Sequence, residues 1–158
     1  MRRLFVLVLF SCESFSSCDF ERGGRARGLW DGVDFSDFTK DCIEIIGLGL
    51  VSQIGVPEEE RAVAQRLEVD VTLWPVSGLG GLGDEIAGTV NYAEVAVACR
   101  AEALRCERRL IETLAEDFCR LLLGRWGLAR VRVRVSKFIL PDTRAVCVTL
   151  TREAADFR

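Results

Sequence analysis

The chain of 158 residues contains no histidine. This absence excludes Ser-His-Asp and Cys-His catalysis, and it removes the commonest metal ligand of proteins. Any general acid–base chemistry must therefore be carried by Glu, Asp, Lys, Tyr, Cys or water.

A large charge of one sign and long apolar runs are also missing. The formal net charge is −3, which gives no electrostatic reason to expect nucleic acid or an anionic membrane as a partner. The apolar run Leu4 to Phe10 is far too short to span a bilayer. The remaining composition, 49% hydrophobic and 28% charged residues, is typical of a single soluble globular domain.

The seven cysteines include no Cys-x-x-Cys pair. An odd and scattered set of this kind is poor evidence for a disulfide framework or a zinc site. Cys99, Cys119 and Cys147 fall in apolar segments, where we expect each thiol to be buried as a small hydrophobic group. A reducing, cytoplasmic compartment fits this pattern best.

Residues 1–39 show no sustained periodicity, which predicts a poorly ordered extension. Met1 to Phe10 has the outline of a secretory signal, and Leu9 to Cys12 faintly resembles a lipoprotein cleavage site. Three interpretations stay open: a start codon assigned too far upstream, which we favour, an export signal, or a genuine organising tail. The predicted domain covers residues 40–153, and residues 154–158 form a C-terminal tail.

From Asp41 onward the pattern is regular and predicts an α+β fold in the order β-β-α-α-β-β. Alternating polar and apolar residues are typical of strands with one wet face, and an i, i+3, i+4 apolar stripe is typical of a helix. Asn91 is the expected N-cap of the first helix. We expect both helices to pack on one face of a four-stranded antiparallel sheet. The expected strands cover residues 42–51, 66–73, 130–137 and 144–151, and the expected helices residues 92–104 and 108–125, the second ending at Gly124 or Gly127.

Two conspicuous patterns have ordinary explanations. Gly78 to Gly83 satisfies G-x-G-x-x-G, but no helix opens at its third glycine and no βαβ unit surrounds it, so we expect a flexible loop. Arg130, Arg132 and Arg134 alternate with valines and have no interleaved aromatic residues, which indicates the solvated face of a strand.

Four fragments of the chain carry polar residues in a fixed order. They are Ile54 to Arg61, Thr89 to Val95, Leu110 to Glu116 and Val131 to Lys137. Together they resemble the dihydroneopterin aldolase family, over about Asp41 to Arg152. The resemblance implies the tunnelling fold and a pterin substrate. It further implies no cofactor or metal, and a homo-oligomer of four or eight subunits with active sites between subunits.

The resemblance also implies roles for individual residues. Lys137 is the general acid/base, Tyr92 delivers a proton to an enol-like intermediate, and Glu60 orients the substrate hydroxyls. Glu112, next to Ile111, anchors the pterin ring, while Thr89, Val90 and Asn91 reach the pterin from a neighbouring subunit. Glu60 is selected from the acidic run because the family glutamate lies five residues after the glycine, here Gly55. Gln65 matches a recurrent glutamine of the family.

Lys137, Glu112 and the acidic run also have ordinary explanations. By parity Lys137 lies on the valine face of its strand, where a lysine can simply extend its ammonium out to water. Glu112 lies where an anion favours a helix N-terminus, and Glu58 to Glu60 could be a solvated charge run. The four fragments together favour the functional interpretation.

The predicted reaction is retro-aldol cleavage of 7,8-dihydroneopterin. Two departures from the family pattern leave alternatives open: Phe138 replaces a usual proline after the lysine, and the glycine-rich loop at 78–83 replaces a more polar stretch. The first alternative is a 2′-epimerase of dihydroneopterin or its triphosphate. The second, of another class, is a noncatalytic exported pterin-binding or structural module, which only the apolar N-terminal run supports.

Overall fold

The computed structural model of the chain describes residues 41–157. The predictions made for residues 1–39 lie outside the described residues. The described part contains a four-stranded antiparallel sheet in the order β1-β2-β3-β4. The strands are β1 (Ile43–Ser52), β2 (Gln65–Pro75), β3 (Leu128–Lys137) and β4 (Val146–Glu153).

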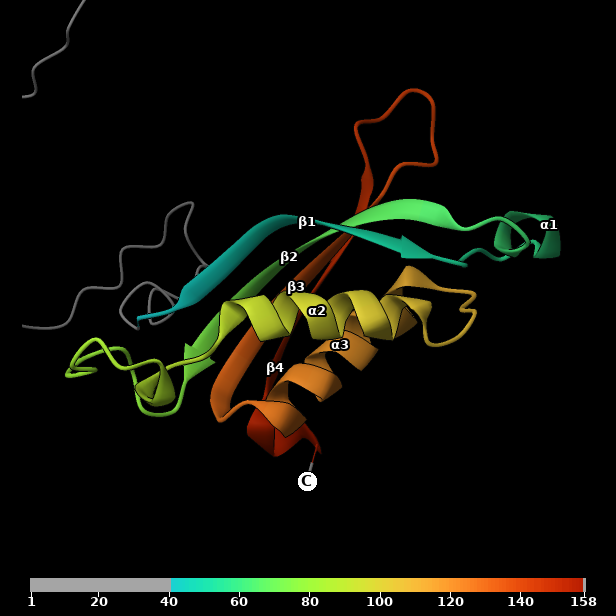
Figure 1. Cartoon of the computed structure of the whole chain (residues 1–158). Helices are drawn as coiled ribbons and strands as arrows, with labels where there is room; N and C mark the ends of the chain where they lie inside the picture. Colours follow the sequence, from blue (N-terminus) through green and yellow to red (C-terminus); the bar gives the residue numbers. More distant parts are fainter. Residues whose placement is uncertain (1–40, 158) are drawn as a thin grey trace, which may run out of the picture. The chain divides into compact units, whose positions relative to one another are not determined.

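Two helices cover one face of this sheet (Figure 1). They are α2 (Tyr92–Leu104), which packs on β1, and α3 (Ile111–Arg125), which packs on β3 and β4. The predicted α+β fold and its element order are therefore confirmed. Three short elements complete the described part: α1 (Glu58–Arg61), η2 (Ile86–Gly88) and η3 (Ala154–Phe157). The last of these falls in the predicted C-terminal tail, and its Phe157 packs against the core.

The second long helix ends at the predicted residue but begins later than predicted. It begins at Ile111 rather than residue 108, because the backbone N–H and C=O of Arg108 bond to residues near the end of β1. It ends at Arg125, so Gly124 lies inside the helix and Gly127 just beyond it. The apolar stripe alone therefore placed the start of this helix too early, because it carries no information about these tertiary hydrogen bonds.

The valine face of β3 forms the centre of the core. Val131, Val133 and Val135 are fully buried, and they lie across from β2 residues of the same kind. Burying these branched side chains against α3 removes apolar surface from water and so stabilises the fold. The arginines between them lie on the opposite face, where Arg132 and Arg134 are exposed, as predicted. Residues 78–83 form a loop, also as predicted, in which Gly78, Gly81 and Gly83 have positive φ angles.

The prediction for the cysteines is right for two and wrong for one. Cys99 and Cys119 are buried in the core, but Cys147 is exposed. The reason is register: Cys147 pairs across the sheet with Ser136, on the face that the helices leave open. Burial raises the pKa of the Cys99 and Cys119 thiols to about 12. A hydrogen bond with Ser136, with a further contribution from Arg134, lowers the pKa of Cys147.

We expect Cys147 to react with thiol reagents while Cys99 and Cys119 do not. A lowered pKa means that the Cys147 thiolate, which is the nucleophile, forms at a lower pH than for an ordinary thiol. The two buried thiols stay protonated throughout the pH range in which the protein is handled. Alkylation of native protein between pH 6 and 9, followed by peptide mass spectrometry, measures this. Rapid modification of Cys99 at pH 7 would contradict it.

Within residues 41–157, no helix combines the length and apolar content needed to cross a membrane.

Candidate active site

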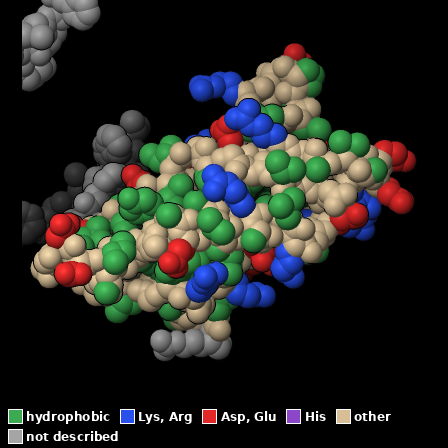
Figure 2. Space-filling view, in the orientation of Figure 1, with side chains coloured by type: hydrophobic (Ala, Val, Ile, Leu, Met, Phe, Trp, Pro, Cys, Tyr) green, Lys and Arg blue, Asp and Glu red, His purple; other side chains and the backbone are tan. Residues whose placement is uncertain are grey.

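The sheet has two ends with different residues at each. At the Lys137 end, β3 stops at Lys137, β1 runs into residues 53–57 and α1, and the α2–α3 connection passes close by. At the opposite, Pro75 end lie the glycine-rich loop and the start of α2 (Figure 1). In Figure 2, acidic side chains gather where Figure 1 places α1, which contributes Glu58, Glu59 and Glu60.

The structure brings Lys137 and Glu60 together. The Lys137 ammonium donates to Glu60 Oε1 at 2.5 Å and to the Ile54 carbonyl oxygen at 3.0 Å. The side chains are 10% and 22% exposed, respectively. Lys137 is therefore buried on the valine face, as its parity predicted, and its ammonium does not extend to bulk water. Partial burial strengthens such a charge-assisted hydrogen bond.

Gln65 fixes the backbone on which this pair depends. Its amide Nε2 donates to the Ile54 carbonyl at 2.6 Å and to the Glu60 carbonyl at 3.0 Å. Because the Ile54 carbonyl also accepts from Lys137, one oxygen links the ammonium to the first residue of β2. The family match of Gln65 thus has a structural explanation.

Arg61 holds the turn between β1 and α1. Its Nη1 donates to the carbonyl oxygens of Gly55 and Val56, each at 2.7 Å, and to that of Pro57 at 3.2 Å. Carbonyls that a loop would otherwise leave unpaired are satisfied in this way. The turn therefore places Glu60 at a defined position facing Lys137.

Gly55 leaves the space that the Glu60 carboxylate occupies. A Cβ added to Gly55 would overlap the carboxylate group of Glu60. We therefore expect Gly55→Ala to push this flexible side chain away from Lys137 while leaving the fold intact. The expected result is a fall in kcat of about 10-fold or more, since catalysis depends steeply on position. Steady-state kinetics beside circular dichroism measure it, with Gly49→Ala as the control, because a Cβ there meets nothing within 4 Å. Unchanged kcat in folded Gly55→Ala would contradict the expectation.

A cavity of about 570 Å³ lies beside the pair. It is lined by Glu60 and Gln65 together with Val63, Phe138 and Ile139, and by the charged side chains Glu59, Arg66 and Glu68. Cavities of a few hundred Å³ with apolar walls and a few polar groups suit small organic ligands. This is the place where a small molecule can contact Glu60 and come near the Lys137 ammonium.

Glu112 and Ile111 lie at the N-terminus of α3, at the Lys137 end. Ile111 is buried, and Glu112 is exposed in the first turn. Glu112 lines a separate hollow of about 450 Å³ between α3 and β4, together with Thr113, Glu116, Leu150 and Arg152 among others. The predicted ring anchor therefore lines a different hollow from Glu60, and within the described residues no hydrogen bond or ion pair joins it to Lys137.

Thr89, Val90, Asn91 and Tyr92 lie at the opposite end of the molecule's described part. Asn91 caps α2 as predicted, since its Oδ1 accepts from the backbone N–H groups of Ala93 and Glu94. Tyr92 is 62% exposed, and Val90 is buried. α2 has 13 residues and is thus about 20 Å long, and its C-terminal end is the one near Lys137, because Ser52 bonds to Ala103. One chain cannot bring Tyr92 and Lys137 onto the same small ligand.

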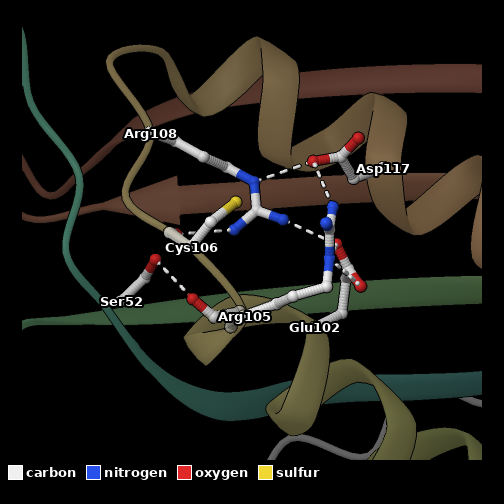
Figure 3. A network of polar contacts seen from close by, with 7 residues as sticks. Ser52, Glu102, Arg105, Cys106, Arg108 and Asp117 are labelled. Carbon is white, nitrogen blue, oxygen red and sulfur yellow. Dashed lines mark hydrogen bonds and ion pairs between the residues drawn. The ribbon is translucent and has the colours of Figure 1, made fainter.

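Sequence reasoning missed Arg108, the centre of a buried polar network (Figure 3). No motif pointed to it, since its carboxylate partners Glu102 and Asp117 lie on two different helices. An unused signal in the sequence singles out Lys137: the chain has only two lysines, Lys40 and Lys137, among its 21 Lys and Arg residues.

Within the described range, no group of three or more Cys, Asp and Glu side chains is placed to hold a metal ion.

The chain is similar to known proteins in sequence and in fold. A family model described as FolB, dihydroneopterin aldolase, matches residues 43–151. A dihydroneopterin aldolase of Bacillus subtilis is 29% identical over 119 residues, which cover 72% of this chain and 98% of the relative.

Two solved structures share the fold and part of the sequence. A putative dihydroneopterin aldolase from Vibrio cholerae has a TM-score of 0.69 at 25% identity, covering 73% of this chain and 98% of that one. The Escherichia coli dihydroneopterin aldolase, solved with neopterin, has a TM-score of 0.66 at 26% identity, covering 71% and 98%.

Proposed function

The chain belongs to the dihydroneopterin aldolase family, and on this premise we propose that it cleaves 7,8-dihydroneopterin. The products are 6-hydroxymethyl-7,8-dihydropterin and glycolaldehyde, and the enzyme is a lyase of folate biosynthesis. The observation that carries the proposal is the buried Lys137 ammonium, bonded to Glu60 and the Ile54 carbonyl beside an open cavity. Both side chains stand at the positions that the family motifs require.

Binding of the pterin ring is assigned to Glu112. A carboxylate can accept two parallel N–H bonds from an amino-pyrimidinone edge, which gives orientation as well as affinity. The helix N-terminus favours the negative charge there, and Glu112 is exposed at the Lys137 end of the sheet. Binding of neopterin by the related Escherichia coli enzyme supports a ligand of this class.

The chemistry needs proton transfers around one carbon–carbon bond. A base removes a hydroxyl proton from the substrate side chain, and the bond breaks to release glycolaldehyde. The electron pair moves into the C=N bond of the pterin ring, which gives an enol-like intermediate that must then be protonated on carbon. Lys137, working through ordered water, exchanges the protons at the side chain and the ring nitrogen, Glu60 orients the hydroxyls, and Tyr92 protonates the intermediate.

The ring itself accepts the electrons in this scheme, so we propose that neither a metal nor a lysine imine takes part. Most aldolases use one or the other to stabilise the carbanion. The chain lacks the histidine ligands of a typical zinc aldolase site. In this proposal the ammonium of Lys137, hydrogen-bonded to Glu60 beside the cavity, provides the acid/base chemistry instead.

We further propose a homo-oligomer of four or eight subunits with active sites between subunits. β1 and β4 are the edges of the described sheet, and unpaired edges favour further strand pairing until a barrel closes. Residues 89–92 lie about one helix length from Lys137. A neighbouring subunit supplying Tyr92, Asn91, Val90 and Thr89 resolves that separation.

A product assay tests the proposed function. Purified full-length protein is incubated separately with 7,8-dihydroneopterin and with its triphosphate, and the products are separated by chromatography. We expect 6-hydroxymethyl-7,8-dihydropterin and glycolaldehyde from dihydroneopterin. Formation of the 2′-epimer alone would identify an epimerase, and binding without any product would indicate a noncatalytic pterin-binding protein.

A further inference from the structure

We propose that Arg108 is a positioning residue for the Lys137–Glu60 pair. It contacts neither side chain, and it acts through the backbone of Ile54 and Gly55. This inference rests on the proposed role of the pair in catalysis. It goes further because it assigns a part in the reaction to a residue outside the motifs and outside the cavity.

The Arg108 guanidinium is buried, and each of its three nitrogens donates a hydrogen bond. Its side chain is 2% exposed. Nε donates to Asp117 Oδ2 at 2.8 Å, Nη2 to Glu102 Oε1 at 2.6 Å, and Nη1 to the Cys106 carbonyl at 3.1 Å (Figure 3). A buried cation of this kind is tolerated only when it is paired and its hydrogens are bonded. The position of Arg108 is therefore fixed by its contacts.

Those contacts tie together the two helices. Glu102 belongs to the last turn of α2, and Asp117 lies within α3. The fork of the guanidinium suits this task, because it presents several donors in a rigid plane. Ser52 adds a second tie, as its hydroxyl donates to the Ala103 carbonyl at 2.7 Å and so joins the end of β1 to the end of α2.

The backbone of Arg108 holds the segment that contacts Lys137. Its N–H donates to the Gln53 carbonyl at 3.0 Å, and its C=O accepts from the Gly55 N–H at 3.1 Å. These two bonds flank Ile54 and form a parallel bridge between the segments. The side-chain fork thus anchors residue 108, and residue 108 sets where Ile54 and Gly55 lie.

Both partners of the catalytic pair depend on that placement. The Ile54 carbonyl accepts from the Lys137 ammonium, and the Glu60 carboxylate packs in the space beside Gly55. A shift of residues 54–55 therefore changes the surroundings of the ammonium and of the carboxylate together. A misplacement of about 1 Å at a distance from the reacting atoms can cost about 100-fold in rate.

Arg108→Met tests the proposal, because methionine keeps much of the side-chain length but removes the fork. We expect kcat to fall about 10-fold to 100-fold, with the dissociation constant for neopterin unchanged, because Glu112 is untouched. Arg105→Met is the matched control: Arg105 pairs with the same two carboxylates from outside, yet its backbone N–H bonds only to Glu102. We expect its kcat to match the wild type, and Arg108→Lys to recover part of the lost rate.

A double-mutant cycle separates positioning from simple stabilisation. If Arg108 acts through the pair, Arg108→Met should lower the residual rate of Lys137→Met far less than it lowers the wild-type rate. If Arg108→Met fails to fold, Glu102→Gln and Asp117→Asn can replace it, since each weakens the same network while keeping its shape. Each of these two variants should also lower kcat.

Two outcomes would overturn the proposal. One is a normal kcat in folded Arg108→Met or in both carboxylate variants, with only the melting temperature reduced, which would show a structural role. The other is a fall in kcat of the Arg105→Met control as large as that of Arg108→Met. A normal kcat in Lys137→Met is a different result, since it would refute the proposed function itself.

Discussion

Lys137→Met is expected to lower kcat for dihydroneopterin cleavage about 1,000-fold, within the range attributed to a positioned general acid or base. Methionine fills a similar volume on the valine face, so the core should keep its packing. The variant removes the only described ammonium that contacts both Glu60 and the Ile54 carbonyl. Neopterin binding, measured by calorimetry, should change little, because the ring is held by Glu112.

Two comparisons give this result its meaning. Arg132→Met removes a positive charge from the same strand, but on the exposed face, and its kcat should equal that of the wild type. Glu112→Ala should show the reverse pattern, with neopterin binding weakened most, since it removes an anchor rather than a proton carrier. Near wild-type turnover in Lys137→Met would show that the acid/base lies elsewhere.

Mixing two inactive variants is expected to restore activity, which is the second large effect. Tyr92→Phe lacks the proton donor, and Glu112→Ala lacks the anchor. If each active site takes Tyr92 from one subunit and Glu112 from the next, about one quarter of the interfaces in randomly mixed rings carry both wild-type residues. Activity should therefore rise from the background of either variant to about that fraction of the wild-type value.

This experiment requires proof that subunits exchange between the two variants. Native mass spectrometry of the mixture shows whether mixed rings have formed, and a mixture of Glu112→Ala with Lys137→Met provides a comparison, since both residues lie at the same end of one subunit. Absence of rescue despite verified exchange, or full activity in a monomer by light scattering, would contradict a site shared between subunits.

The local pattern of polar and apolar residues was sufficient to predict the four strands, the two long helices and the buried face on which Lys137 lies. The alternation of Arg and Val along β3 is a short-range property, so the same parity that buries Val133 and Val135 also buries Lys137. The cap of α2 was predictable for the same reason, because Asn91 bonds to backbone groups only two and three residues away.

Contacts between distant segments were beyond such reasoning. The acidic run gave no physical reason to prefer Glu60 over its neighbours, and the preference came from the family spacing. The structure supplies the reason, in the space beside Gly55 and the hydrogen bond from Lys137. Arg108 was missed because its partners are spread over α2, α3 and residues 53–55. The exposure of Cys147 likewise follows from the pairing register of β4, which the apolar surroundings of that residue did not reveal.

Turnover of 7,8-dihydroneopterin in D₂O by metal-stripped protein, with both products analysed by mass spectrometry, tests the proposed chemistry most directly. Protonation of an enol-like intermediate on carbon predicts equal amounts of glycolaldehyde and 6-hydroxymethyl-7,8-dihydropterin, the latter carrying one deuterium on its hydroxymethyl carbon. Borohydride added with substrate should leave the rate unchanged, because no imine forms. Cleavage that stops when metal is removed, or a hydroxymethyl product without deuterium, would contradict cofactor-free acid–base catalysis at Lys137.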